Sequence, residues 1–488
     1  MLTFIQSHSF HFLPHFNSMG HSFFNFILFI FLLSLWSSPL AHSRNTPHNA
    51  KTTTLDIVSS IKKTYQVLNF NPNLKKQQQK GSSFSSSSFS MQLHSRASIH
   101  NSSHSDYKSL TLSRLTRDSA RVNSILTQLD PNFNQQKLSG PIISGTSQGS
   151  GEYFSRIGIG EPPSQAYVVL DTGSDISWVQ CAPCADCYRQ ADPIFEPSSS
   201  ASYTPITCQA NQCKWLDQSQ CHNGHCLYEV SYGDGSYTVG DFITETVTIG
   251  ATSVNNIAIG CGHNNEGLFV GAAGLLGLGG GPLSFPAQLN STSFSYCLVD
   301  RDSDLVSTLE FDSPLSRNAV TAPLKRNPEL NTFYFVGLVG ISVGGELLPI
   351  PETSFMVDST EGGGVIVDSG TAVTRLRSDV YDIVRDAFVR GTRDLPAAND
   401  VSLFDTCYDL SLRSSVEVPT VAFHFGEGEV LVLPAKNYLV PVDSVGTFCF
   451  AFAPTMGSLS IIGNIQQQGT RVSFDLVKSV IGFSPNSC

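Results

Sequence analysis

Residues 168–174 read Val-Val-Leu-Asp-Thr-Gly-Ser, and residues 365–371 read Val-Ile-Val-Asp-Ser-Gly-Thr. Both stretches place an acidic residue, a hydroxyl residue, a glycine and a second hydroxyl residue directly after an apolar run. Each is followed by two apolar residues and a glycine, at 275–277 and at 461–463. One such motif is weak evidence, but its recurrence behind matching apolar runs indicates an internal duplication.

From residue 141 onward, short runs of Val, Ile, Thr, Tyr and Phe are punctuated by Gly, Pro, Asn and Asp. This spacing of roughly ten residues is typical of all-β structure. We therefore predict an all-β fold with two related β lobes, 141–330 and 331–488, each contributing one Asp. Helix is scarce; the best candidate runs from Asp379 to Arg390, with Ser378 as its N-cap and Gly391 as its stop.

The duplicated motif predicts a pair of facing carboxylates, Asp171 and Asp368. Gly173 and Gly370 allow the backbone to turn sharply, so that N–H groups approach each carboxylate. Two facing carboxylates share one proton, and such a pair can hydrolyse an amide by general acid/base activation of water, without a metal or a covalent intermediate. The alternative is that each Asp only caps a tight turn.

The hydroxyl residues of the two motifs are expected to support this pair. We expect Ser174 and Thr371 to bond across to the opposite lobe and hold the two loops symmetrically. Thr172 and Ser369 complete the supporting set of each loop.

The chain from about 141 to 488 resembles the pepsin-like aspartic proteases, and within them the atypical, nepenthesin-like group of plants. The resemblance rests on the segments 171–175 (DTGSD), 181–184 (CAPC), 231–236 (SYGDGS), 368–371 (DSGT) and 461–464 (IIGN). It implies a bilobal acid-protease fold with a substrate cleft between the lobes, endopeptidase activity of the aspartic type, Asp171 and Asp368 as catalytic residues, polypeptide substrates and no cofactor. Ser369 stands where many members have Thr.

The resemblance also implies a flap, a β-hairpin that closes over the substrate. It falls on residues 226–245, with a turn at Asp234–Gly235. The flap tyrosine is Tyr232, followed by Gly233, and the indole N–H of Trp178 is expected to bond its hydroxyl. The alternative for both aromatic residues is simple core packing.

The N-terminal part of the chain differs from the rest in charge. Residues 1–140 hold 13 Lys and Arg against 4 Asp and Glu, a net charge of +9, whereas the remainder carries −20. We assign 1–43 to a signal peptide around the apolar stretch 23–36, with an uncleaved membrane anchor as the alternative. Residues 44–140, here called the leader, are predicted to be a largely disordered basic pro-segment of a zymogen.

One part of the leader has helix-forming residues. The stretch Asp106–Leu126 carries Arg114, Arg117 and Arg121 and is predicted to dock as a basic helix, with a solvated linker as the alternative. Opposite charge attracts the leader to the acidic part of the chain and to the cleft carboxylates themselves. The leader is therefore expected to act as an intramolecular inhibitor that acid releases.

All 12 cysteines lie between Cys181 and Cys488, an even number that fits disulfides formed in the secretory pathway. The cysteines at 181, 184 and 187 have a spacing that could also indicate a metal site. An iron–sulfur motif needs a further Cys at 191, where this chain has Ala, and we expect no metal. Spacing alone leaves the pairing open. The resemblance implies Cys181–Cys184, Cys187–Cys261, Cys208–Cys226, Cys213–Cys221, Cys297–Cys488 and Cys407–Cys449.

The remaining expectations concern partners and location. Asn290 begins a candidate glycosylation sequon in the acidic part of the chain. We expect a monomer without stable membrane insertion after signal cleavage, destined for the extracellular space, with the endoplasmic reticulum and vacuole left open. The rivals are a catalytically inactive binding or inhibitor protein on the same fold and a DNA-binding protein; the −20 charge argues against nucleic acid.

Overall fold

The computed structural model describes residues 51–70, 89–99, 104–128, 153–232, 236–267, 271–357 and 363–488. The signal peptide assigned to 1–43 lies outside these residues. Within the described ranges, no helix has the length and apolar character needed to cross a bilayer.

The duplicated motif lies on matching strands in the two halves of the chain. In the first half, β4 (Ser164–Asp171) ends on the acidic residue and pairs in parallel with β11 (Gly274–Gly277). In the second half, β18 (Gly364–Val367) ends one residue before Asp368 and pairs in parallel with β28 (Leu459–Ile462). The repeated apolar pairs followed by glycine are therefore the neighbours of the two strands that carry the acids.

We call residues 153–488 the body. The first half of the body is built almost entirely of strands. Its other elements are β3 (Tyr153–Ile159), β5 (Trp178–Gln180), η2 (Pro197–Ser199), β6 (Thr204–Pro205), α6 (Asn211–Lys214), β7 (Ser219–His222), β8 (His225–Ser231), β9 (Tyr237–Ile249), β10 (Thr252–Glu266), α7 (Phe285–Gln288), β12 (Ser293–Cys297), β13 (Val306–Phe311) and β14 (Val320–Lys325).

The second half has the same character, with one longer helix. Its other elements are β15 (Phe335–Val336), β16 (Leu338–Val343), β17 (Glu346–Leu347), η3 (Glu352–Phe355), β19 (Thr374–Arg377), α8 (Ser378–Gly391), β20 (Ala397–Ala398), β21 (Cys407–Asp409), β22 (Ser415–Pro419), β23 (Val421–Phe425), η4 (Gly426–Gly428), β24 (Val430–Val432), η5 (Ala435–Asn437), β25 (Leu439–Pro441), β26 (Thr447–Phe450), β27 (Phe452–Thr455), α9 (Asn464–Gln467), β29 (Thr470–Asp475) and β30 (Val480–Pro485). The all-β prediction is confirmed.

The predicted helix in the second half is present as α8, with one correction at its start. Ser378 is the first helical residue and not the N-cap; its hydroxyl donates to the carbonyl of Thr455 at 2.9 Å. One face of α8 is buried, with Val384 and Phe388 fully covered.

A continuous sheet joins the two halves. Its strands follow the order β4-β3-β2-β13-β12-β29-β30-β14. The rings of Phe294 on β12 and Phe474 on β29 stack across the junction, with centroids 4.5 Å apart. Fully burying a Phe side chain contributes about 1.5–3 kcal/mol, so this junction fixes one half against the other and sets the spacing of the two acids.

The leader is more ordered than we predicted. Its described parts form β1 (Thr52–Asp56), α2 (Ile57–Val67), β2 (Phe89–Ser95), α4 (Arg96–Ile99) and α5 (Tyr107–Gln128). β1 pairs with β22, and β2 lies between β3 and β13. Leu55 and Ile57 are buried in the main hydrophobic core. The leader sequence is polar, and the apolar surface that orders it is supplied by the body, which is why composition misled us.

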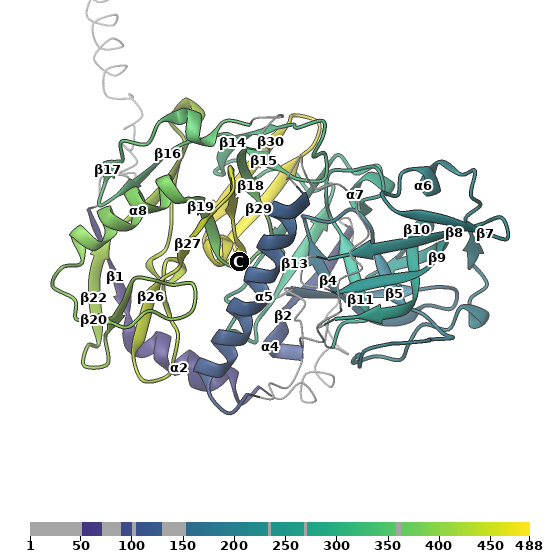
Figure 1. The fold of residues 1–488 in the computed structure, drawn as a ribbon, viewed down its shortest axis with the longest axis horizontal. Helices are drawn as coiled ribbons and strands as arrows, with labels where there is room; N and C mark the ends of the chain where they lie inside the picture. The colour runs from purple at the N-terminus through teal and green to yellow at the C-terminus, as the bar shows by residue number, and fades with distance from the viewer. Residues whose placement is uncertain are drawn as a thin grey trace, which may run out of the picture. The chain divides into compact units, whose positions relative to one another are not determined.

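The predicted basic helix is α5, which extends the predicted stretch by two residues at its C-terminal end. In Figure 1 it lies between the strands of the first half, in teal, and those of the second half, in green. Its apolar residues pack on the second half: Leu115 joins a cluster with Val373 and Ile465, and Val122 joins one with Ile461.

Candidate active site

The two acids lie at the centre of the body, each held by its own loop. Asp171 is 1% exposed and Asp368 is fully buried. The N–H of Gly173 donates to Asp171 Oδ1 at 2.9 Å, and that of Gly370 donates to Asp368 Oδ1 at 3.0 Å. A Cβ at Gly370 would lie 2.4 Å from Asp171 Oδ1, and one at Gly173 would lie 3.1 Å from Asp368 Oδ1. Glycine is therefore needed at both positions because the carboxylate of the opposite loop lies against it.

The hydroxyl residues of the two loops have exchanged the roles that we predicted. Ser174 Oγ donates to Asp171 Oδ2 at 2.5 Å, and Thr371 Oγ1 donates to Asp368 Oδ2 at 2.6 Å. Each therefore bonds the acid of its own loop and does not bridge the halves, because a hydroxyl three residues after the acid folds back onto it.

The bridge is made by the residues that directly follow the acids. The N–H of Ser369 donates to Thr172 Oγ1 at 2.8 Å, and the N–H of Thr172 donates to Ser369 Oγ at 3.2 Å. The two hydroxyl oxygens lie 3.3 Å apart. These reciprocal bonds hold the two acid loops together.

A leader arginine occupies the space between the acids. Arg121 on α5 donates from Nη1 and Nη2 to the two oxygens of Asp171, at 2.8 and 2.6 Å. It also donates from Nε and Nη2 to Asp368, at 3.1 and 3.3 Å. A planar guanidinium with several donors suits this bidentate recognition of carboxylates. One side chain thus hydrogen-bonds both acids and fills the gap between them.

The acids respond differently to this environment. Burial raises the pKa of Asp171 and outweighs the charge of Arg121, which lowers it. Burial also raises the pKa of Asp368, but Arg121, the Thr371 hydroxyl and the Gly370 N–H lower it by more, so that its net pKa lies below the usual value. The pKa of Arg121 is raised because the charges of both acids outweigh its burial.

A second leader contact lies just beyond the dyad. Asp118 Oδ1 accepts hydrogen bonds from the N–H groups of Ala372 and Val373, at 2.6 and 3.1 Å, and Asp118 Oδ2 accepts one from Arg375 Nη2 at 2.5 Å. Asp118 is 1% exposed and Arg375 is 6% exposed. Our sequence analysis missed this contact.

The first half of the body holds the start of the same helix. Arg114 Nη1 donates to Asp302 Oδ1 at 2.8 Å, and the Tyr107 hydroxyl donates to Asp302 Oδ2. Arg117 hydrogen-bonds Ser113 within the helix. Positions 114, 118 and 121 follow the i, i+4, i+7 pattern of one helical face, and this spacing of charges could have identified all three contacts.

The flap is positioned by the strands that we predicted. β8 and β9 pair antiparallel up to Ser231 and Tyr237. Trp178 Nε1 donates to the Tyr232 hydroxyl at 2.8 Å, which confirms the predicted pair. Gly233 and the turn at Asp234–Gly235 lie outside the described residues.

All twelve cysteines form disulfides, and two of the six predicted pairs are confirmed. These are Cys297–Cys488 and Cys407–Cys449. Four predicted pairs are wrong: Cys181–Cys184, Cys187–Cys261, Cys208–Cys226 and Cys213–Cys221. The observed bonds in their place are Cys181–Cys261, Cys184–Cys187, Cys208–Cys221 and Cys213–Cys226.

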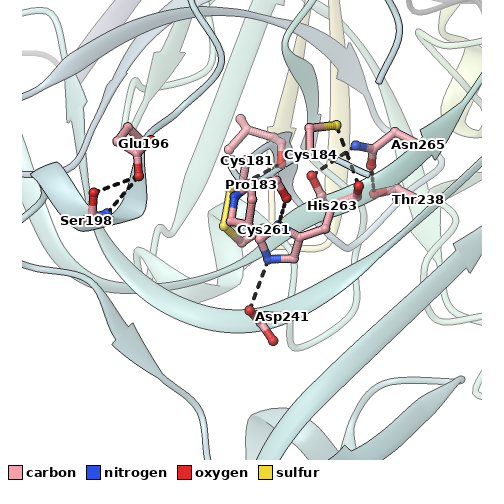
Figure 2. Close-up of a disulfide and its surroundings, with 12 residues drawn as sticks. Cys181, Pro183, Cys184, Glu196, Ser198, Thr238, Asp241, Cys261, His263 and Asn265 are labelled. Carbon is pink, nitrogen blue, oxygen red and sulfur yellow. Dashed lines mark hydrogen bonds and ion pairs between the residues drawn. A yellow bond between two sulfur atoms is a disulfide. The ribbon is translucent and has the colours of Figure 1, made fainter. Parts of the chain in front are cut away.

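Strand pairing explains the first exchange. β5 lies parallel to β10 with Val179 opposite Cys261, which brings Cys181 to a Cα–Cα distance of 5.3 Å from Cys261. Figure 2 shows this bond. Cys184 and Cys187 then close a short turn on their own.

Burial explains the second exchange. Cys221 and Cys226 lie opposite each other in the β7–β8 hairpin. Cys226 is fully buried and joins the buried Cys213 inside a small core cluster. Cys221 is exposed and joins Cys208, which is only partly covered.

Other candidate ligands and modification sites are simpler. In the described ranges, no group of three or more His, Cys, Asp and Glu side chains is arranged to hold a metal ion. Asn290 is exposed and follows α7, with φ of 51°. Its glycosylation stays a prediction.

A fold of two related β halves, each contributing one buried acid to a shared pair, defines a peptidase of the aspartic type. Comparison with known proteins agrees. Residues 153–311 match the family model described as "Xylanase inhibitor N-terminal", and residues 333–485 match the one described as "Xylanase inhibitor C-terminal". The chain belongs to the pepsin-like aspartic protease family and is an aspartic endopeptidase.

The curated relatives carry protease names. The chain is 51% identical over 387 residues to "Protein ASPARTIC PROTEASE IN GUARD CELL 2" of Arabidopsis thaliana, covering 77% of this chain and 82% of that protein. It is 55% identical over 392 residues to "Aspartyl protease family protein 2" of the same plant, covering 77% and 81%. It is 41% identical over 362 residues to "Aspartic proteinase nepenthesin-1" of Nepenthes gracilis, covering 72% and 82%.

Solved structures share the fold. The crystal structure of edgp aligns with a TM-score of 0.57 at 20% identity, covering 68% of this chain and 91% of that one. Basic 7S globulin from soybean aligns with a TM-score of 0.54 at 21% identity, covering 70% and 94%.

Proposed function

We propose that this aspartic endopeptidase is made as a zymogen in the secretory pathway, with Asp171 and Asp368 as its catalytic residues and the leader as its intramolecular inhibitor. The observation that carries the proposal is the guanidinium of Arg121, which hydrogen-bonds both acids at once. While Arg121 is in place, no water can lie between the carboxylates and no substrate can approach them.

The chemistry follows from removing that arginine. Two buried carboxylates that have lost the guanidinium they shared cannot both stay ionised, so one of them takes up a proton. The ionised acid removes a proton from a bound water, and the resulting oxygen nucleophile attacks the scissile carbonyl. The protonated acid hydrogen-bonds the carbonyl oxygen and stabilises the negative charge that develops there. Thr172 and Ser369 hold the loops in register, and Trp178 orients Tyr232 of the flap over the substrate.

Acid would release the leader because several of its partners are carboxylates. Lys63 Nζ lies 2.7 Å from Asp300 Oδ2. Burial raises the pKa of Asp300, but the charge of Lys63, its hydrogen bond and the N–H of Asp302 together lower it by more. The net pKa of Asp368 is lowered as well. At pH values above the usual Asp pKa of 3.8, each of these two ionised carboxylates stabilises the docked leader. That contribution is lost as the pH falls through the lowered pKa of the group.

The secretory assignment is supported by the six disulfides and by the apolar stretch at 23–36. We infer export to the extracellular space, a monomeric enzyme without a membrane anchor, and a glycan on the exposed Asn290. Imaging a C-terminal fluorescent fusion tests the location, and terminal sequencing of the processed protein tests where the leader ends.

A second candidate is a binding protein on the same fold, because both matching family models are described as xylanase inhibitors. Such a protein does not need a working pair of acids. Both acid loops here keep the glycines and hydroxyl residues that hold the carboxylates, which favours the protease.

Cleavage of denatured globin at acid pH separates the two functions. Replacing one acid removes half of the acid/base pair, so Asp171→Asn and Asp368→Asn should each lower the rate by at least about 10²–10⁴-fold. A statine-type inhibitor should block the wild type. The exposed Asp400→Asn is the matched control and should cleave normally. Full activity in either dyad variant would exclude the dyad assignment.

The inhibitory leader has its own test. Full-length protein with the leader intact should be inactive at neutral pH and become active after acid treatment. Equal activity at both pH values, with the leader still uncut, would exclude the zymogen proposal and leave the protease assignment standing.

A further inference from the structure

Leader residue Asp118 fills a receptor that belongs to the body. Its carboxylate accepts from the Ala372 and Val373 N–H groups and from Arg375 Nη2. We propose that these groups form a subsite for an acidic side chain of the substrate, which Asp118 occupies until the leader departs. This inference rests on the proposed proteolytic function and adds a substrate preference to it.

The receptor does not need the leader for its shape. The carbonyls of Thr371 and Ala372 accept hydrogen bonds from the N–H groups of Asn464 and Ile465, at 2.7 and 3.0 Å. These two hydrogen bonds from the start of α9 fix the turn, so that the N–H groups of Ala372 and Val373 point in the same direction. Two adjacent N–H groups that converge on one oxygen form an anion-binding concavity.

Arg375 supplies the charge of the subsite and is equally fixed. It lies on β19, where it pairs with Ala453 of β27 and with Ile461 of β28. It is 6% exposed, its guanidinium pairs with Asp118, and its Nε has no hydrogen-bond partner. Once Asp118 has left, the guanidinium of Arg375 lacks its counter-charge, and a substrate carboxylate can take that place.

The position of the subsite relative to the cut bond follows from the helix. Asp118 lies three residues before Arg121, which marks the catalytic centre, and three residues of helix advance by about 4.5 Å. An extended substrate advances by about 3.3 Å per residue. The subsite therefore takes a side chain within about three residues of the scissile bond.

The experiment uses the activated enzyme and peptides that differ at one position. Asp and Asn are compared at each of four residues on either side of the cut, and kcat/KM is measured. At one position within three residues of the cut, Asp should exceed Asn by about tenfold or more, since hydrogen bonds to charged groups are the stronger ones. The preference for Asp should be seen at about pH 5 and should decrease at pH values under about 4, where the Asp side chain of the peptide takes up a proton.

Two arginine variants test the assignment. Arg375→Gln should bring the Asp-to-Asn ratio close to one, and Arg375→Lys should leave an intermediate ratio, because lysine keeps the charge but not the planar donor array. The half-buried Arg377→Gln on the same strand is the matched control and should keep the full ratio. A second measurement leaves the enzyme unchanged: a synthetic leader peptide of residues 104–128 should inhibit it at least about tenfold less well when it carries Asp118→Asn.

The outcomes are distinct. The subsite is excluded if the wild type shows no preference for Asp within three residues of the cut, or if the preference survives Arg375→Gln. If no peptide is cleaved, or if Asp171→Asn cleaves them all, the proposed function itself fails. Both results can be read from the same peptide series.

Discussion

The contacts that hold the leader and those that hold the cysteine-rich loop of the first half, residues 181–187, depend on different titrating groups. The leader is bound through carboxylates, among them Asp300 and Asp368, whose net pKa values are lowered. The loop is bound through His263. Its Nδ1 lies 3.0 Å from the carbonyl oxygen of Pro183, and its Nε2 lies 3.0 Å from Asp241 Oδ2.

The histidine contact is built for the charged ring. Figure 2 shows His263 close to both Asp241 and Pro183. Both partners are acceptors, and only the doubly protonated imidazolium can donate to both. The hydrogen bond to Asp241 is the main reason why the pKa of His263 is raised, against a smaller opposing effect of burial.

The two regions therefore respond differently to pH. The His263 contact stabilises the fold below the usual histidine pKa of 6.5 as long as Asp241 stays ionised, and its contribution is lost as the pH rises through the raised pKa of His263. The leader contacts contribute above 3.8 and are lost as the pH falls through the lowered values. A rise in pH thus weakens only the histidine contact, whereas acidification below about pH 4 weakens the leader contacts and, through the lowered pKa of Asp241, the histidine contact as well.

The largest effect is expected for Arg121→Gln in the full-length protein. Removing one partner of a buried ion pair costs about 3–5 kcal/mol, so the leader should dock much less firmly at neutral pH. Hydrogen exchange of the α5 amides should speed up by about 10²-fold or more. The exposed Lys108→Gln on the same helix is the control. Unchanged protection of α5 would show that Arg121 does not hold the leader.

A smaller effect is expected for Lys63→Gln. The side chains of Lys63 and Asp300 are 38% and 20% exposed, so solvent screens the pair. The variant should lose about 0.5–1 kcal/mol of unfolding free energy at pH 7. The loss should decrease as the pH falls through the lowered pKa of Asp300, where the wild type loses the ion pair too. Denaturant unfolding of Lys63→Gln and of the exposed control Lys62→Gln measures this; a loss independent of pH would contradict it.

The smallest effect is expected for His263→Gln, and it should have the opposite pH dependence. The contact is partly open to solvent, so the expected loss is about 0.5 kcal/mol at pH 5, and it should decrease as the pH rises through the raised pKa of His263. A double-mutant cycle with Asp241→Asn isolates the coupling between the two side chains. Coupling that does not change with pH would mean that the ring is not charged in this contact.

The sequence was sufficient to predict the parts of the site that are encoded in local motifs. The duplicated acid loops, the flap pair Trp178 and Tyr232 and the basic helix were all identified from residue order or family resemblance. The bridging hydroxyls were not, because residues 172 and 174 are both hydroxyl residues, and only the course of the turn decides which of them faces the other half.

Contacts between distant segments were the other source of error. Four disulfide pairs, which the family resemblance had implied, were wrong because strand register and burial determine which sulfur atoms meet. The order in the leader was missed because its apolar partners lie in the body, hundreds of residues away. Asp118 was missed for the same reason: its receptor is a backbone turn and an arginine of the second half.

The strand β2 has a consequence for maturation that goes beyond the active site. Its residues 89–94 pair with β13 and its residues 93–95 pair with β3. Withdrawal of that strand would leave two open edges facing each other, and open edges readily accept another extended chain. If the leader is removed as we propose, cutting the polypeptide is only the first step of activation, since the position of β2 has to be filled by another strand before the sheet is whole again.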